Sequence, residues 1–569
     1  MAAVLIATVT IAWLIVQYFS PPMDLIIEGG QIIDGKGNEP RRADIGICGG
    51  RICAIGFLQA QPARQRINAQ GLFIAPGFID VHTHIEPNIP TNAPVYALNF
   101  VRQGVTTVIT GNCGSSRVPL DSLFEREHNG WQINIGSLVG HNDVRKKVMG
   151  EAQRVASGAE LEHMREIVTE AMRNGALGFS TGLAYTPGNA ANPHELLVLA
   201  GVAARYGGVY ATHIRDEANN GDDAVREAIE IGRTAGLPVE ISHFKMSGQA
   251  QWGLAEKRLA LVTSARQRGE QVFIDLYPYT YSSTQLDLVF PPKWLEPGVM
   301  RRVSRNPQLR KKLAAEILDR AKINGWRDLS FATVAFFGHD HTLDGLTINQ
   351  VCSRRSGQDC TPEEQADTAI DLRLHGGAQM LYHDMEQRDV DTIAGFEDGM
   401  IGSDGSVRYA NELGRRHPRA WTTFPTFLAR YVRGQGIRSD SIVGFPTISW
   451  GEAARRMSGL PAEFFGLSDR GTIELGKWAD LTVFDPATIG VEAIVGEEDI
   501  SQSVTGIMDV LVNGKAVILN GIETHELPGV AIRRQRALGW PTLARTNSLS
   551  AKPMETPHYL AEHANSNGQ

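Results

Sequence analysis

The sequence predicts an α/β fold, a (β/α)8 barrel of the TIM type accompanied by a small β domain built from both chain ends. Two observations predict it. Between residues 76 and 464, short apolar runs alternate with helical patterns, as parallel strands and their crossover helices do. On either side, residues 24–75 and 465–535 are rich in short strands and turns.

The two flanking regions show the same sequence pattern. In residues 24–75, β-rich runs are separated by glycine turns, and the same pattern returns in 471–486 and 507–521. The pair Asn513-Gly514 between two apolar runs is typical of a tight hairpin. We therefore expect one β domain that the chain leaves near its start and rejoins near its end.

The central region holds eight candidate strands. They are residues 77–84, 105–112, 133–141, 176–182, 209–214, 239–244, 272–278 and 400–405. Helical patterns separate several of them, and the clearest span 160–175 and 222–236, with Gly175, Asp222 and Gly236 as expected caps. Because the gap from 278 to 400 is too long for one unit, we expect an insertion at about 285–345.

The two ends of the chain fall outside this fold. Residues 2–16 are apolar but short for a membrane span, which needs about 20 residues, and neither a basic start nor a clear cleavage site accompanies them. The segment 1–22 could be a membrane anchor through residues 2–19 or an atypical signal peptide. Alternatively, an upstream start codon was assigned in error and the protein begins at Met23. A start at Met23 predicts a cytoplasmic protein, whereas an anchor or a signal peptide predicts an anchored or exported one. The tail 540–569 is polar.

Composition excludes several classes of protein. The 569 residues are 42% hydrophobic and 21% charged, as in a globular protein, and the net charge of −8 argues against nucleic-acid binding. The five cysteines contain no CxxC pair, which argues against a disulfide scaffold and a zinc ribbon. We expect no catalytic role for Cys48, Cys53, Cys352 and Cys360.

Residue types suited to metal binding gather at the ends of the predicted strands, where barrel enzymes carry their chemistry. The pair His82 and His84 has the spacing that points both imidazoles to one side of a strand. Imidazoles and a thiolate are good zinc ligands, and one carboxylate facing a metal-bound water is a natural general base. The complete set is His82, His84, Cys113, His213, His243 and Asp404.

One absence refines this expectation. Many two-metal barrel hydrolases bridge their ions with a carboxylated lysine on the fourth strand. No lysine occurs between Val148 and Thr212, so the run 176–182 cannot supply one. Cys113 is the obvious replacement, because a thiolate brings the negative charge that the site would otherwise lack.

The motifs together resemble a known family, the N-acyl-D-amino-acid deacylases (D-aminoacylases) of the metal-dependent amidohydrolase superfamily. The resemblance covers about residues 24–535 and implies the barrel with a small β-sandwich from both chain ends. The segments that carry it are PGFIDVHTH, GVTTVITGNCG, ALGFSTGLAYTPG, YATHIRDE, EISHFK, YPYTYSST, MIGSDG and HPRAWTTFP. It implies zinc-dependent hydrolysis of the amide bond of N-acyl-D-amino acids, which releases a D-amino acid and a carboxylate.

The resemblance also implies roles for individual residues. One tightly bound zinc would be held by Cys113, His213 and His243, and a second, weaker metal position would involve His82 and His84, with Cys113 able to bridge the two. Asp404 would be the catalytic carboxylate and Lys245 would lie beside the site. The substrate carboxylate would be held by Tyr277, Ser283 and Arg419. The sequence departs from the family at Phe244, where histidine is common, and in a longer, more basic segment 406–416.

Two other functions are weighed against this one. A cyclic-amide hydrolase, like the dihydroorotases and hydantoinases, is disfavoured by the missing lysine and by the GNCG motif. A non-catalytic, membrane-tethered binding protein is disfavoured because all six site residues are intact. The sequence leaves three questions open. They are whether one zinc ion or two are required, which amino-acid side chain is preferred, and whether the acyl group is acetyl or a long chain.

Overall fold

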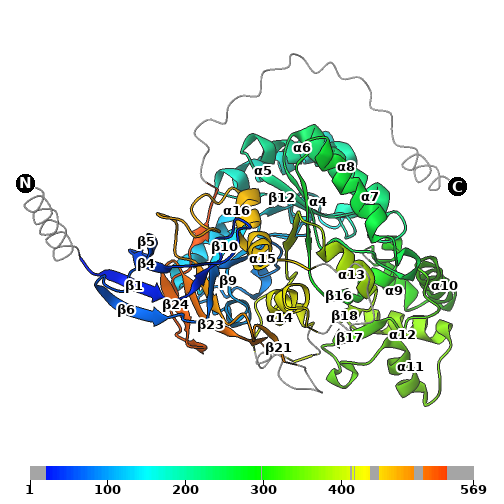
Figure 1. The fold of residues 1–569 in the computed structure, drawn as a ribbon. Coiled ribbons are helices and arrows are strands. Elements are labelled where there is room, and N and C mark those ends of the chain that lie inside the picture. Colours follow the sequence, from blue (N-terminus) through cyan, green and yellow to red (C-terminus); the bar gives the residue numbers. More distant parts are fainter. Residues whose placement is uncertain are drawn as a thin grey trace, which may run out of the picture. The chain divides into compact units, whose positions relative to one another are not determined.

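The computed structural model describes residues 21–296, 298–409, 413–414, 417–435, 447–492 and 504–534 (Figure 1). All of them belong to one compact unit that ends at Arg534. The tail 540–569 and residues 1–20 of the apolar N-terminal segment lie outside the described residues, so the anchor, signal and start-site interpretations stay predictions. Among the described residues, no helix has both the length and the apolar character needed to traverse a bilayer.

All eight predicted strand segments contain strands. They are β8 (Phe78–Asp80), β9 (Val105–Thr110), β10 (Asn134–Ser137) with β11 (Val139–Gly140), β12 (Gly178–Gly182), β13 (Val209–His213), β14 (Val239–Ile241), β15 (Val272–Leu276) and β19 (Gly399–Ile401). The sequence VTTVIT of β9 is buried at every position, as expected for β-branched residues in a parallel sheet that is covered on both faces.

These strands pair in parallel and in chain order. One sheet contains β8, β9 and β10, and another runs β11-β12-β13-β14-β15-β19. Only Leu138 separates β10 from β11, and its N–H donates to Thr110 O at 2.9 Å. At the other edges, a parallel bridge joins Thr83 to Gly405, and the Asp404 N–H donates to His82 O at 2.8 Å. The two sheets therefore meet at both of their ends.

Helices connect the parallel strands. They include α4 (His141–Met149), α5 (Gly158–Arg173), α6 (Pro193–Arg205), α7 (Gly221–Ala235), α8 (Ala255–Gln267) and α13 (Gln387–Ala394). Helix α5 packs on α6, α6 on α7 and α7 on α8, and the four helices gather at the top of the view in Figure 1. The predicted helices at 160–175 and 222–236 are confirmed with small shifts. The N-cap of α7 is Asn220 rather than Asp222, whereas Gly236 ends it in the expected left-handed conformation.

Between β15 and β19 the chain builds an additional subregion. Its antiparallel sheet has the order β16-β18-β17, formed by β16 (Ser282–Gln285), β17 (Ala332–Phe336) and β18 (Gln379–Tyr382). Helices α9 (Val299–Val303), α10 (Pro307–Ile323), α11 (Ile348–Ser356) and α12 (Pro362–Leu374) accompany it. A separate hydrophobic cluster runs from Leu286 to Tyr382, so it continues past residue 345.

The two chain ends contribute to common β structure. One sheet has the order β5-β4-β1-β6 and the other β25-β24-β23-β20-β7-β2-β3. The N-terminal strands are β1 (Met23–Glu28), β2 (Gln31–Ile32), β3 (Arg41–Arg42), β4 (Asp44–Cys48), β5 (Arg51–Gly56), β6 (Ala63–Asn68) and β7 (Phe73–Pro76), and the C-terminal ones are β20 (Leu481–Phe484), β23 (Ile507–Val512), β24 (Lys515–Leu519) and β25 (Ile522–Glu523). One hydrophobic cluster contains side chains of both sheets, including Ile27 and Leu481.

The expected hairpin at Asn513-Gly514 is confirmed. It joins β23 to β24, and both residues have positive φ angles, of 49° and 80°. Further elements are α2 (Leu98–Val101), α3 (Asp121–Phe124), α14 (Arg419–Phe427), α15 (Trp450–Ala454), α16 (Leu460–Phe465), β21 (Gly490–Val491), β22 (Val504–Thr505) and β26 (Ala531–Ile532).

The cysteines add a feature that the sequence analysis did not anticipate. Disulfides join Cys48 to Cys53 and Cys352 to Cys360, over sequence separations of 5 and 8 residues. Cys113 is the free cysteine. Both bridges close short local loops, so the main source of stability is still the burial of apolar side chains.

Candidate active site

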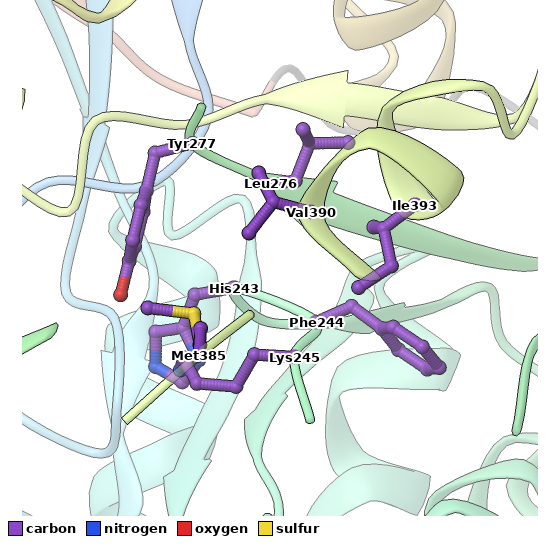
Figure 2. Close-up of a pocket in the computed structure, with 8 residues that line it drawn as sticks. All are labelled: His243, Phe244, Lys245, Leu276, Tyr277, Met385, Val390 and Ile393. Carbon is purple, nitrogen blue, oxygen red and sulfur yellow. Dashed lines mark hydrogen bonds between the residues drawn. The ribbon is translucent and has the colours of Figure 1, made fainter. Parts of the chain in front are cut away.

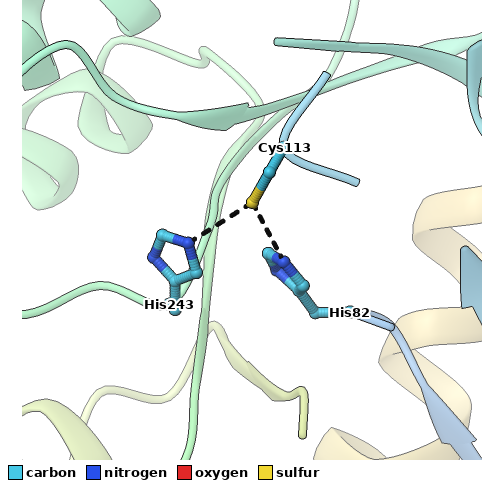
Figure 3. A group of neighbouring side chains, drawn as sticks. All are labelled: His82, Cys113 and His243. Carbon is cyan, nitrogen blue, oxygen red and sulfur yellow. Dashed lines mark hydrogen bonds between the residues drawn. The ribbon is translucent and has the colours of Figure 1, made fainter. Parts of the chain in front are cut away.

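The six predicted metal-site residues lie together at the carboxyl ends of the parallel strands. Cys113 Sγ is 3.3 Å from His82 Nε2, 3.5 Å from His243 Nε2 and 3.8 Å from His213 Nδ1. Figure 3 shows the cysteine between two of these imidazoles. Asp404 Oδ1 lies 3.1 Å from His84 Nε2. Strand ends far apart in the sequence thus bring the whole set into one place.

Unusual backbone conformations aim several of these side chains. Cys113, His243 and Asp404 have φ angles of 51°, 37° and 50°. This left-handed region is uncommon for residues other than glycine, and such strained positions cluster at functional sites. Each of the three lies two or three residues past the end of a strand, in the turn that follows it.

The donor atoms fit a zinc site. In the part of the chain that the structure describes, three groups have ligand atoms within 4.8 Å of one another: His82, Cys113 and His243; His82, His84 and Asp404; and His213, Glu217 and His243. Imidazole nitrogen and thiolate sulfur are preferred zinc ligands. Burial alone would raise the pKa of Cys113, but His82, His213 and His243 hold that pKa well below its usual value. A thiolate is therefore favoured at the centre of the cluster.

Asp275, which the sequence analysis missed, supports two of the histidines. It is fully buried on β15, and its Oδ2 is 3.1 Å from His82 Nδ1. Its Oδ1 accepts the His243 N–H at 2.9 Å. A carboxylate behind a ligand histidine fixes the orientation of the ring. The signal in the sequence was an aspartate inside the otherwise apolar strand VFIDL.

Glu217 was missed as well. Its Oε1 lies 2.9 Å from His243 Nδ1 and accepts a hydrogen bond from Lys245 Nζ at 2.6 Å, while its Oε2 is 3.8 Å from His213 Nε2. Burial would raise the pKa of Glu217, but Lys245, His213 and His243 hold it well below the usual value. The pKa of Lys245 is raised, because Glu217 outweighs the effect of burial. A buried ion pair therefore adjoins the cluster.

Asp404 is held as a carboxylate. Arg419 Nη1 is 2.8 Å from its Oδ2, and both side chains are largely buried. Burial would raise the pKa of Asp404, but Arg419 and the hydrogen bond from His84 keep that pKa well below its usual value. An ionised carboxylate that faces the donor cluster can accept a proton.

The remaining predicted substrate residues surround Arg419. Its Nη2 donates to the backbone carbonyl of Ser283 at 3.1 Å, and its Cζ lies 5.1 Å from the centre of the Tyr277 ring. The Ser283 hydroxyl donates to Met380 O at 3.0 Å, so Ser283 meets Arg419 through its backbone. Lys245 Nζ is 5.9 Å from the centre of the Tyr277 ring, so two cations lie near this ring.

A cavity of about 1310 Å³ opens over this cluster. Its lining includes Cys113 and Asp404 from the strand ends, Arg419 from the start of α14, and Phe336 and Gln379 from the subregion between β15 and β19. A far smaller void of about 10 Å³ lies behind His243 and Lys245 (Figure 2). Phe244, the position where histidine is common in the family, lines this small void.

Comparison with known proteins identifies the family. The amidohydrolase family profile matches residues 65–272 and 418–518. A D-aminoacylase from Alcaligenes xylosoxydans xylosoxydans is 35% identical over 549 residues, which covers 92% of this chain and 100% of the relative.

Solved structures agree with this. The zinc- and phosphonate-bound N-acyl-D-glutamate deacylase of Bordetella bronchiseptica superimposes with a TM-score of 0.74 at 32% identity, over 90% of this chain and 100% of that one. A D-aminoacylase described as having a binuclear metal centre gives a TM-score of 0.73 at 31% identity, over 90% and 99% of the two chains. The chain therefore belongs to the amidohydrolase family, and within it to the D-aminoacylases, the N-acyl-D-amino-acid deacylases.

Proposed function

We propose that this enzyme hydrolyses the amide bond of N-acyl-D-amino acids with the help of zinc, and releases a D-amino acid and a carboxylate. The observation that carries the proposal is the buried contact between Arg419 and Asp404 beside the thiolate–imidazole cluster. A guanidinium suits a substrate carboxylate, and the neighbouring aspartate suits a general base. The names and activities of the relatives support the same reaction.

The metal would be held by the residues predicted from the sequence. Cys113, His213 and His243 would hold the tight zinc, and His82 and His84 would form a weaker second position that shares Cys113. A zinc ion held there would supply Lewis-acid chemistry: it would polarise the amide carbonyl and would lower the pKa of a bound water from about 15.7 towards about 7. The binuclear centre described for the similar D-aminoacylase supports two positions in this site.

The protein's own groups then orient the substrate and move the proton. The guanidinium of Arg419 binds the α-carboxylate and thereby fixes where the amide lies. Asp404 accepts the proton of the attacking water and passes it to the leaving amine. Tyr277 and Lys245 border the same space, and Ser283 orients Arg419 through its carbonyl oxygen. The substrate is therefore a small molecule with a free carboxylate.

The proposed architecture follows from the strand order. Eight parallel strands in sequence order, with the two sheets meeting at both ends, support a closed (β/α)8 barrel over residues 76–464. A hydrophobic cluster shared by two sheets supports a β-sandwich formed by residues 24–75 and 465–535. The segment that begins at β16 would be the insertion on the barrel.

A substrate panel tests the proposal against its rivals. The purified protein is assayed with N-acetyl and longer N-acyl derivatives of D- and L-amino acids, and with dihydroorotate and hydantoins, while its zinc content is measured. We expect release of D-amino acids alone and zinc in the active preparation. Turnover of the cyclic amides would instead favour the hydantoinase-like function, and a zinc-loaded protein inactive on every substrate would favour a binding protein.

A further inference from the structure

One carboxylate faces the outer nitrogens of two proposed zinc ligands. Glu217 Oε1 lies 2.9 Å from Nδ1 of His243, and Glu217 Oε2 lies 3.8 Å from Nε2 of His213. The inner nitrogens of the same two rings face Cys113 Sγ, through Nε2 of His243 and Nδ1 of His213. The two imidazoles thus present opposite nitrogens to the centre but share one carboxylate behind them.

The chemistry of imidazole makes this arrangement important. A neutral histidine carries one ring proton, and the nitrogen that binds a metal must be the one without it. When Nε2 of His243 acts as a ligand, its proton lies on Nδ1 and needs an acceptor. Glu217 Oε1 is at the right distance to be that acceptor.

Lys245 competes for the same nitrogen. Its Nζ lies 2.8 Å from His243 Nδ1 as well as 2.6 Å from Glu217 Oε1 (the lysine and histidine are shown in Figure 2). An ammonium group can only donate. A hydrogen bond from Lys245 to Nδ1 therefore leaves the ring proton on Nε2, the nitrogen that faces Cys113, and this tautomer cannot bind a metal.

We propose that Glu217 is a positioning residue that selects the metal-binding tautomer of His243. It does so by accepting the Nδ1 proton and by drawing the Lys245 ammonium away from that nitrogen. Its second oxygen lies 3.8 Å from His213 Nε2, so the same carboxylate also places negative charge behind the other imidazole of the tight zinc position. This inference rests on the zinc assignment of the proposed function.

The test measures zinc affinity, by competition with a chromogenic chelator, in the full-length protein. We expect Glu217→Ala to bind zinc about 10- to 100-fold more weakly than the wild type, and Glu217→Gln to be weakened to a smaller extent. Glu230→Gln removes an exposed carboxylate that pairs with Arg233 on α7, and it should keep wild-type affinity. Thermal unfolding of the metal-free variants monitors the fold.

A second substitution separates tautomer selection from simple structural support. If Lys245 competes for His243, then Lys245→Met alone should keep zinc affinity, and adding it to Glu217→Ala should restore much of the lost affinity. A double variant no tighter than Glu217→Ala would overturn the proposed competition. Affinity within threefold of wild type in both Glu217 variants would overturn the inference while leaving the proposed function intact. A wild-type protein that binds no zinc through Cys113 would overturn both.

Discussion

The guanidinium of Arg419 and the carboxylate of Asp404 form an ion pair, with Nη1 and Oδ2 2.8 Å apart. The other carboxylate oxygen of Asp404 lies 3.1 Å from His84 Nε2. The group proposed to bind the substrate and the group proposed to move the proton are therefore already in contact. A substrate carboxylate that binds Arg419 must share or replace Asp404 as its partner, which couples binding to the position of the base.

Replacing Arg419 by alanine should lower kcat/KM for substrates with a free carboxylate. Loss of a charged hydrogen bond costs about 1.5–3 kcal/mol, or roughly 10- to 100-fold in kcat/KM, and we expect most of it in KM. Steady-state kinetics on an N-acyl-D-amino acid and on its neutral amide measure the effect. An equal loss on both compounds would show that Arg419 does not bind the carboxylate.

Asp404→Asn should keep zinc bound and lose about 10²- to 10⁴-fold in kcat, because an amide cannot accept the proton. The similar size of asparagine preserves the contacts around Arg419. Zinc content and kcat are measured on the same preparation. Turnover near that of the wild type would remove Asp404 from the mechanism.

Cys113→Ala should empty the tight metal position, since Sγ lies within 3.8 Å of three histidine nitrogens and alanine offers no ligand atom. The expected result is less than one tenth of the zinc that the wild type retains after dialysis against a chelator. Cys352, which lies in a disulfide in the subregion between β15 and β19, has no such contact. Full zinc occupancy in the Cys113 variant would refute the thiolate ligand.

Asp384 should make stability depend on pH. Burial raises its pKa from 3.8 to about 6, despite Lys245 and the hydroxyl donors Ser247 and Ser282. The folded protein therefore holds this proton where the unfolded chain has lost it, so the contribution of Asp384 is most favourable below about pH 4 and declines as the pH rises through 6. Asp384→Asn removes the titration but keeps an acceptor for both serines.

Chemical denaturation of the wild type and Asp384→Asn at several pH values measures this difference. A pKa shift of about two units corresponds to roughly 3 kcal/mol. The difference in the free energy of unfolding between the variant and the wild type should therefore change by about this amount, in favour of the variant, between pH 4 and 8. A constant difference across this range would contradict the raised pKa of Asp384.

The sequence was most informative where local pattern and chemistry coincide. The strand segments were predictable because β-branched apolar runs alternate with capped helices. The clustering of the six residues proposed for the metal site was predictable because histidine, cysteine and aspartate stand at strand ends. Gly236 was predictable as a helix end because its left-handed conformation suits glycine.

The rest depends on tertiary contacts that spacing does not encode. Glu217 lies in a charged stretch, RDE, that is indistinguishable from a solvated loop until Lys245 and His243 are placed beside it. Asp275 was hidden within a strand pattern. The hydrogen bond from the Ser283 hydroxyl to Met380 O likewise arises from the pairing of β16 with β18, which the sequence pattern does not show.

The pairing of β7 with β20 has a consequence for how the chain is made. In this pairing Ala75 lies opposite Thr482, so an early strand finds its neighbour only when nearly all of the chain has been synthesised. On its other side β7 pairs with β2, so one edge of β7 stays open until β20 has been made. The pairing of β7 with β20 is therefore a late step in the formation of this sheet.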